Sequence, residues 1–269
     1  MTIKADAVVT LSDRVERLQA YDISTDAVRI SPRVLLDNYT VLNSDIEKPD
    51  RASVVGDGVL AFVSGMSEQN QVDVQHSYLF ASLVASKQFP RDDQGKEWYD
   101  KFLEVMQTCG WVIVRKYYDT VAASGKSFKM DQLVLSILGS AATVAAIPGA
   151  TSLLMLEVAR NAISKLEARD RPLRLFEQNI KESGSGGFSV SACHETSQGE
   201  VLMAMGAVRF IQRTNQTQVL FVNWDSSSVD LYRGESYMAM VPTLINLTRA
   251  TILGKLGDRA VTKIEEYEI

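Results

Sequence analysis

The chain contains 25 consecutive residues without a charged side chain, from Gln132 to Leu156, and no other feature constrains its fold as strongly. A stretch of that length could cross the apolar interior of a bilayer. Two observations favour another structure: Pro148 and Gly149 interrupt the run, and serine and threonine hydroxyls reduce its hydrophobicity. The sequence therefore predicts a buried helical hairpin. The alternative is a membrane-inserting or pore-forming toxin that uses the hydrophobic hairpin at 132–156.

Patterns typical of helices and of strands alternate between about residue 51 and residue 130. Apolar residues at helical spacing, ended by Pro90 and Gly110, predict two amphipathic helices. Glycine-bounded and β-branched runs predict strands, and we expect the second of these to be central in its sheet. The expected elements are a strand at 58–63, helices at 73–89 and 95–109, and a strand at 111–120.

Strand patterns dominate after a Gly/Ser-rich segment at 181–187, which we interpret as a hinge within the domain. Three runs separated by polar turns, at 188–195, 201–213 and 217–226, have the spacing of an antiparallel meander. A last helix is expected from Val241 to Leu256, with Pro242 in its first turn and a glycine after its end.

These patterns together predict a single α+β domain over residues 1–269, with antiparallel strands around a central buried helical hairpin. The signal is weakest over residues 1–50, where a short helix at 12–20 is the only clear pattern. The role of this N-terminal segment stays open.

The charge distribution excludes some classes of partner. The formal net charge is -5, and no basic patch of the kind needed to bind a phosphate backbone is present, so we expect no nucleic-acid partner. The first residues lack the continuous apolar region of a secretory signal peptide. We therefore expect synthesis in the cytoplasm, followed by membrane association or by export through a non-classical route.

The segment "GFSVSACHETSQGE" places Cys193 beside His194 in a chain with only two cysteines and two histidines. Neighbouring side chains on a strand point to opposite faces, so these two residues cannot form a catalytic pair. His76 could approach Cys193 only through tertiary folding, which leaves a cysteine-dependent acyltransferase or thioesterase as an alternative. Metal-ligand motifs such as CxxC or HExxH are lacking, and we expect neither a metal site nor catalytic residues.

Alternation along this strand predicts what surrounds the cysteine. One face carries Phe188, Val190, Ala192 and His194, and the other carries Ser189, Ser191, Cys193 and Glu195. A buried cysteine that acts as a small apolar residue is the simplest interpretation. A small polar pocket on that face would fit the pattern too.

Several longer segments resemble the Erwinia virulence factor (Evf) family. They are "DVQHSYLFASLVASKQFPRDDQGKEWYDKFLEVMQTCGWVIV", the uncharged helical region, "LRLFEQN", "GGFSVSACHETSQGEVLMAMGAVRF", "VLFVNWDSSSVDLYRG" and "ILGKLGD". The likeness covers most of the chain from about Asp73 to the C-terminus. Its motifs are architectural rather than catalytic.

The resemblance implies an α+β fold of complex topology and a cysteine that carries covalently bound palmitate as a thioester in a hydrophobic cavity. Cys193 matches that cysteine by its position in "GGFSVSAC", whereas Cys109 does not match and is expected to be structural. The resemblance implies a non-enzymatic, S-acylated bacterial protein that acts as a virulence or host-colonisation factor toward an insect host. Its expected partners are the fatty acyl chain and a membrane surface, and its oligomeric state is not indicated.

Overall fold

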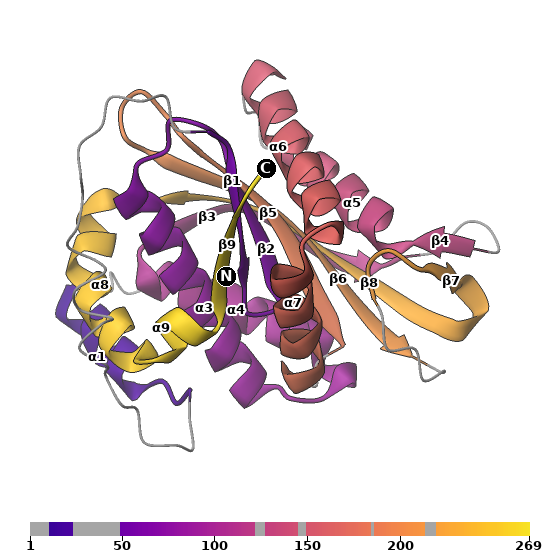
Figure 1. Cartoon of the computed structure of the whole chain (residues 1–269). Helices are drawn as coiled ribbons and strands as arrows, with labels where there is room; N and C mark the ends of the chain where they lie inside the picture. Colours follow the sequence, from indigo (N-terminus) through magenta and orange to yellow (C-terminus); the bar gives the residue numbers. More distant parts are fainter. Residues whose placement is uncertain (1–10, 24–48, 122–126, 145–148, 184–185, 213–218) are drawn as a thin grey trace, which may run out of the picture.

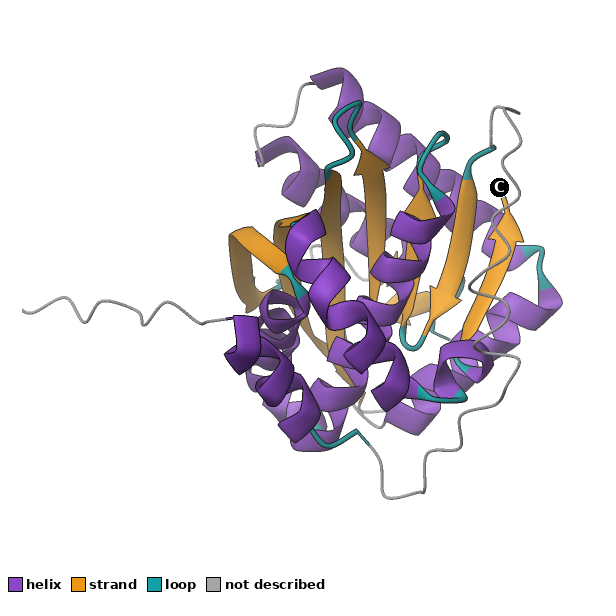
Figure 2. Ribbon diagram, turned by 90° about the vertical axis from the view of Figure 1, so that its left-hand side faces the viewer, coloured by secondary structure: helices purple, strands orange, loops and turns teal. Residues whose placement is uncertain are grey.

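The computed structural model describes residues 11–23, 49–121, 127–144, 149–183, 186–212 and 219–269 (Figure 1). Its architecture is α+β, as the sequence predicts: one large sheet has helices packed on both faces (Figure 2). Most of residues 1–50 lie outside the described ranges, as do residues 184–185 within the expected hinge.

The large sheet has seven strands, and all neighbouring strands are antiparallel except β2 and β5, which are parallel. Strands β4 (Ser127–Lys129) and β7 (Asn223–Asp225) form a separate antiparallel pair. The order along the large sheet is β3 (Trp111–Thr120), β8 (Val229–Met240), β6 (Val201–Gln212), β5 (Gly187–Glu195), β2 (Gly58–Phe62), β1 (Arg51–Val55) and β9 (Ile264–Glu268).

The helices form two layers, one on each face of the sheet (Figure 1). The short 3-10 turns η1 (Asp92–Gln94) and η2 (Ser226–Ser228) precede α4 and β8, and α9 (Arg259–Thr262) leads into β9. The first layer consists of α1 (Leu11–Ala20), α3 (Glu68–Gln88), α4 (Gly95–Cys109) and α8 (Pro242–Leu256), and the second of α5 (Met130–Val144), α6 (Gly149–Glu167) and α7 (Asp170–Ser183).

Each face of the sheet contributes to a separate apolar core. Phe188, Val190 and Ala192 of β5 pack in the core under α5, α6 and α7, whereas Cys193 packs in the core under α3, α4 and α8. This confirms the alternation that the sequence predicts for this strand. Burial of both faces also explains why the inner strands contain few charged side chains.

Helices α5 and α6 form the expected hairpin over one face of the sheet, although residues 145–148 between them lie outside the described ranges. The hairpin is buried on one side only, because Leu153 and Leu154 of α6 are 70% and 38% exposed. Among the described residues, no helix combines the length and the hydrophobicity that crossing a bilayer requires.

Two expectations about strands are wrong. The run at 111–120 forms β3, which is an edge strand rather than a central one, with Val112 and Val114 49% and 58% exposed. The third strand of the expected meander is also misplaced: β6 pairs with β8, while only Asn223–Asp225 of the predicted run form a strand, in the small sheet. Strand propensity reports a pleated, half-buried environment and does not give the order of the strands.

Candidate functional site

Cys193 lies near the C-terminal end of β5, in the interior of the sheet. Its neighbours across the strand are Phe62 on β2 and Met203 on β6, and its carbonyl oxygen accepts a hydrogen bond from the Val63 amide at 3.0 Å. The side chain is fully buried in the first helical layer. The backbone is therefore fixed on both sides, and the sulfur faces apolar atoms.

Methionine makes up an unusual share of the core around this cysteine. Six of the nine methionines in the chain belong to the same buried cluster as Cys193: Met66, Met106, Met203, Met205, Met238 and Met240. Unbranched thioether side chains adapt to irregular spaces and repack with little loss of contact. This layer could therefore accommodate an additional apolar group better than a core of branched side chains.

Ser191 lies two residues before Cys193 on the same face of β5 and is fully buried. Among the residues that the structure describes, its hydroxyl oxygen has no hydrogen-bond partner. Buried hydroxyls normally make hydrogen bonds. A further polar atom placed beside Ser191 would therefore be stabilised by a hydrogen bond to this hydroxyl. The two Cα atoms are about 7 Å apart along the strand, within reach of a group attached to the cysteine sulfur.

Burial raises the pKa of the Cys193 thiol, and no charged side chain lowers it. The thiol is therefore protonated at neutral pH, and a protonated thiol is a poor nucleophile. In the closed structure Cys193 is protected both from acyl donors and from water.

His76 does not approach Cys193. Helix α3 directs Val74 and Tyr78 toward the sheet, where the Tyr78 hydroxyl bonds Ser189 of β5 at 2.7 Å. His76 follows Val74 by two residues, about 200° around the helix, so it points away from the sheet. Desolvation lowers its pKa to about 4, which is the behaviour of a buried neutral imidazole.

The two residues after Cys193, His194 and Glu195, lie on opposite faces of β5. His194 points to the opposite side of the sheet, and its buried Nδ1 atom has no hydrogen-bond partner within the described part of the chain. Glu195 accepts a hydrogen bond from the backbone amide of Ser67, the N-cap residue of α3, at 2.8 Å. This bond ties the end of β5 to the beginning of α3.

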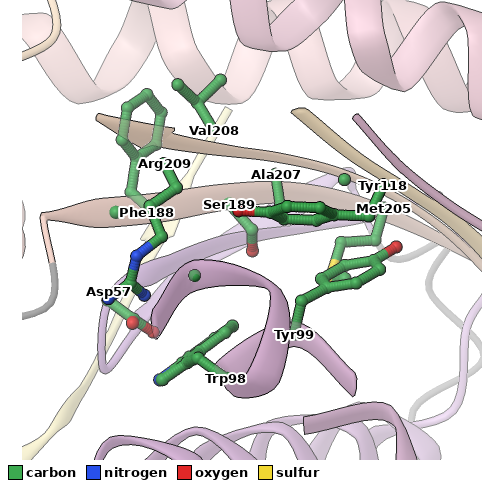
Figure 3. Close-up of a pocket in the computed structure, with 13 residues that line it drawn as sticks. Asp57, Trp98, Tyr99, Tyr118, Phe188, Ser189, Met205, Ala207, Val208 and Arg209 are labelled. Atoms are coloured by element: carbon green, nitrogen blue, oxygen red, sulfur yellow. The ribbon is translucent and has the colours of Figure 1, made fainter. Parts of the chain in front are cut away.

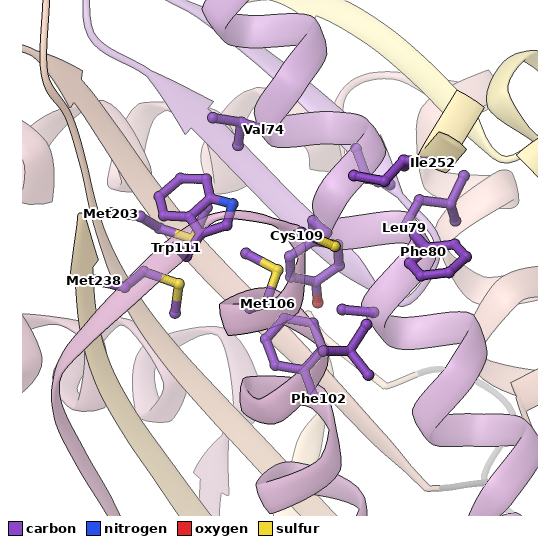
Figure 4. Packing of buried hydrophobic residues seen from close by; sticks show 14 of the residues in the cluster. Val74, Leu79, Phe80, Phe102, Met106, Cys109, Trp111, Met203, Met238 and Ile252 are labelled. Carbon is purple, nitrogen blue, oxygen red and sulfur yellow. The ribbon is translucent and has the colours of Figure 1, made fainter. Parts of the chain in front are cut away.

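Cys109 ends α4 and lies in a buried apolar cluster (Figure 4). The same cluster includes Cys193. Both cysteines have free thiols. The carbonyl oxygen of Cys109 accepts a hydrogen bond from the Thr248 hydroxyl of α8, which joins two helices of the first layer. The surroundings of Cys109 fit the structural role expected for it.

A buried polar cluster that no local sequence pattern indicates lies at the other end of β5. The Asp57 carboxylate accepts a hydrogen bond from Ser82 at 2.8 Å, and the paired hydroxyls of Tyr78 and Ser189 lie nearby. Arg209 extends toward Asp57 (Figure 3). Asp57 stands between two glycines in "VVGDGV", a pattern that indicates a turn and gives no sign of burial.

This polar cluster borders a narrow internal pocket between the sheet and α4 (Figure 3). The space available to water-sized groups is about 20 Å³, which corresponds to about one water molecule. Its other walls are aromatic and apolar, and they include Trp98, Tyr99 and Met205. Within the described ranges, no group of three or more histidine, cysteine or carboxylate side chains is arranged to bind a metal ion.

No family model matches the chain, and no curated protein matches it. A solved structure titled "Structure of the Evf virulence factor" aligns with a TM-score of 0.29 and 11% sequence identity, over 87% of this chain and 97% of that one. A TM-score of 0.29 is too low to establish a shared fold or function.

Proposed function

We propose that this protein carries a fatty acyl chain in thioester linkage on Cys193 and acts, without catalytic turnover, as a virulence or host-colonisation factor. The role in a host and the choice of palmitate come from the sequence resemblance. Cys193 is proposed as the attachment site because it is buried in a methionine-rich layer, beside a Ser191 hydroxyl that has no partner among the described residues.

The attachment reaction is a thioester exchange. The Cys193 thiolate attacks the carbonyl carbon of an acyl thioester donor, the new carbon–sulfur bond forms, and the donor's thiolate leaves and takes up the proton that Cys193 lost. The Ser191 hydroxyl then donates a hydrogen bond to the new carbonyl oxygen. That bond would satisfy the buried hydroxyl and fix the direction in which the chain leaves the sulfur.

The acyl chain would lie between the sheet and the first helical layer. Each buried methylene contributes about 0.8 kcal/mol, so a sixteen-carbon chain gains on the order of 10 kcal/mol by leaving water. The six methionines would repack around it. Enclosure would also shield the thioester from hydrolysis.

Burial of the thiol limits when Cys193 can be acylated. Because the pKa of Cys193 is raised and its side chain is inaccessible, transfer to the closed structure is slow. Acylation would therefore take place before the first helical layer closes on the sheet, or in an opened state of that layer.

A membrane surface is the second partner in this proposal. A single acyl chain gives only marginal and reversible membrane binding, so stable association needs another contact. Leu153 and Leu154 supply exposed apolar surface within the uncharged hairpin. Insertion of the whole hairpin would instead require α5 and α6 to leave the sheet and expose their buried faces.

The direct test is the intact mass of the purified full-length protein before and after treatment with neutral hydroxylamine, which cleaves thioesters. We expect a loss of about 238 Da, the mass that a palmitoyl group adds. Cys193→Ser should lack this mass from the start, and Cys109→Ser should retain it. An unmodified mass in protein from a host that supplies acyl donors, or loss of the modification in Cys109→Ser alone, would overturn the attachment site.

A further inference from the structure

A groove opens on the surface where the β1–β2 turn, the C-terminal half of α3 and the segment before β9 meet. Its volume is about 310 Å³, within the range of small-molecule sites. Its lining includes the apolar residues Leu79, Leu83 and Ile23 and the polar residues Asp57 and Ser82. Lys87 and Lys263 also line it, so apolar surface lies next to basic groups.

The walls of the groove are held by bonds between segments far apart in the sequence. Asn179 of α7 donates a hydrogen bond to the carbonyl oxygen of Gly56 at 2.8 Å, and its own side-chain oxygen accepts one from the Lys263 ammonium at 3.0 Å. The Gly56 amide in turn bonds the carbonyl oxygen of Lys263 at 3.0 Å. The ammonium of Lys263 is thus positioned by the fold.

The charges around the groove favour an anion. Lys87 on α3 and Lys263 before β9 are positive, and Arg209 of β6 adds positive charge behind Asp57. Asp57 is the acidic group that lines the groove, and burial raises its pKa above the ordinary value. Its hydrogen-bonding neighbour Tyr78 stays neutral, because burial raises the pKa of that hydroxyl as well.

We propose that this groove binds a small amphipathic anion, whose carboxylate or phosphate lies between Lys87 and Lys263 and whose short apolar chain covers Leu79 and Leu83. The site is separate from Cys193. Gly58, next to Asp57, pairs with Ser189, whereas Phe62 pairs with Cys193, so the two sites are four residues, or about 13 Å, apart along β5. Binding here does not depend on acylation.

The test is calorimetric titration of the full-length protein with octanoate and with octyl phosphate, each below its micellar concentration. Octanol and octyltrimethylammonium serve as the neutral and cationic comparisons. We expect at least one of the two anions to bind, and Lys87→Glu to weaken its binding by about 10-fold or more. The relative affinity of the two anions identifies the preferred head group.

Lys165→Glu is the matched control, because Lys165, like Lys87, is an exposed lysine in the last turn of a helix. It should bind the anion as the unsubstituted protein does. Asp57→Asn should strengthen binding above the pKa of Asp57, where the carboxylate repels the ligand. The proposal is overturned if neither anion binds, if octyltrimethylammonium binds as well as the anions, or if Lys87→Glu and Lys165→Glu have equal effects.

Discussion

The carboxylate of Glu195 accepts a hydrogen bond from the backbone amide of Ser67 at 2.8 Å, across 128 positions of sequence. This contact joins the strand that carries Cys193 to the N-cap residue of the helix that covers it. A negative charge at a helix N-terminus also interacts favourably with the helix dipole. Glu195 therefore helps to hold α3 over the cysteine.

Replacing Glu195 by alanine should lower the free energy of unfolding by about 1 kcal/mol, because an amide at the start of α3 loses its partner. Chemical denaturation measures this change. Glu200→Ala is a suitable control, since Glu200 follows the same strand and its side chain makes no hydrogen bond to α3. Equal losses in the two variants would show that the bond to Ser67 contributes nothing specific.

The unacylated protein should protect Cys193 from thiol reagents. In Cys109→Ser, we expect the remaining thiol to react with a disulfide reagent at least about 100-fold more slowly than a free cysteine, because its raised pKa leaves little thiolate and its burial blocks access. Denaturant should restore the full rate. Rapid reaction under native conditions would contradict the closed geometry around the sulfur.

Gly58 allows α3 to approach the sheet closely. A methyl group at this position would lie 2.4 Å from the Tyr78 hydroxyl oxygen, and the ring cannot move away without breaking its bond to Ser189. We expect Gly58→Ala to destabilise the protein by about 1–3 kcal/mol, the usual effect of overpacking.

Gly149→Ala provides the comparison for that substitution, because no atom of the described residues lies within 4 Å of the methyl group it would add. Its melting temperature should equal or slightly exceed that of the unsubstituted protein, since alanine is the better helix former. If Gly58→Ala melted at the same temperature as Gly149→Ala, the close contact with Tyr78 would be wrong.

The sequence predicts local structure in this protein much better than it predicts tertiary pairing. The amphipathic spacing and end signals give α4 and α8 nearly to the residue, because caps such as Gly110 and first-turn residues such as Pro242 act locally. The end of α3 is predicted to within one residue, but its start at Glu68 lies five residues before the predicted one. The edge position of β3 and the parallel pairing of β2 with β5 depend on contacts between distant segments, and no local pattern encodes them.

The same division applies to the candidate sites. Alternation along β5 places Cys193 and Ser191 on one face, and the structure confirms it. The burial of Asp57, and the presence of Lys87 and Lys263 in the lining of one groove, depend on how α7, α9 and the β1–β2 turn assemble. Lys87 and Lys263 are separated by 176 positions and do not form a local sequence motif.

Acidification should destabilise the protein through His76. Its pKa in the folded protein is lowered to about 4 from 6.5, so the unfolded chain binds the proton more tightly. Stability from this group is fully present above pH 6.5 and is lost as the pH falls toward 4. A depression of this size corresponds to roughly 3 kcal/mol.

Thermal or denaturant unfolding measured between pH 7 and pH 4 tests this expectation, with His76→Gln as the variant that removes the titrating group. The free energy of unfolding of the unsubstituted protein should fall more steeply over this range than that of the variant. Asp57 acts in the opposite direction, because its raised pKa favours the folded state at low pH, so Asp57→Asn should steepen the fall instead. Parallel profiles for the unsubstituted protein and His76→Gln would mean that the imidazole is hydrated in solution and that His76 is less buried than the structure indicates.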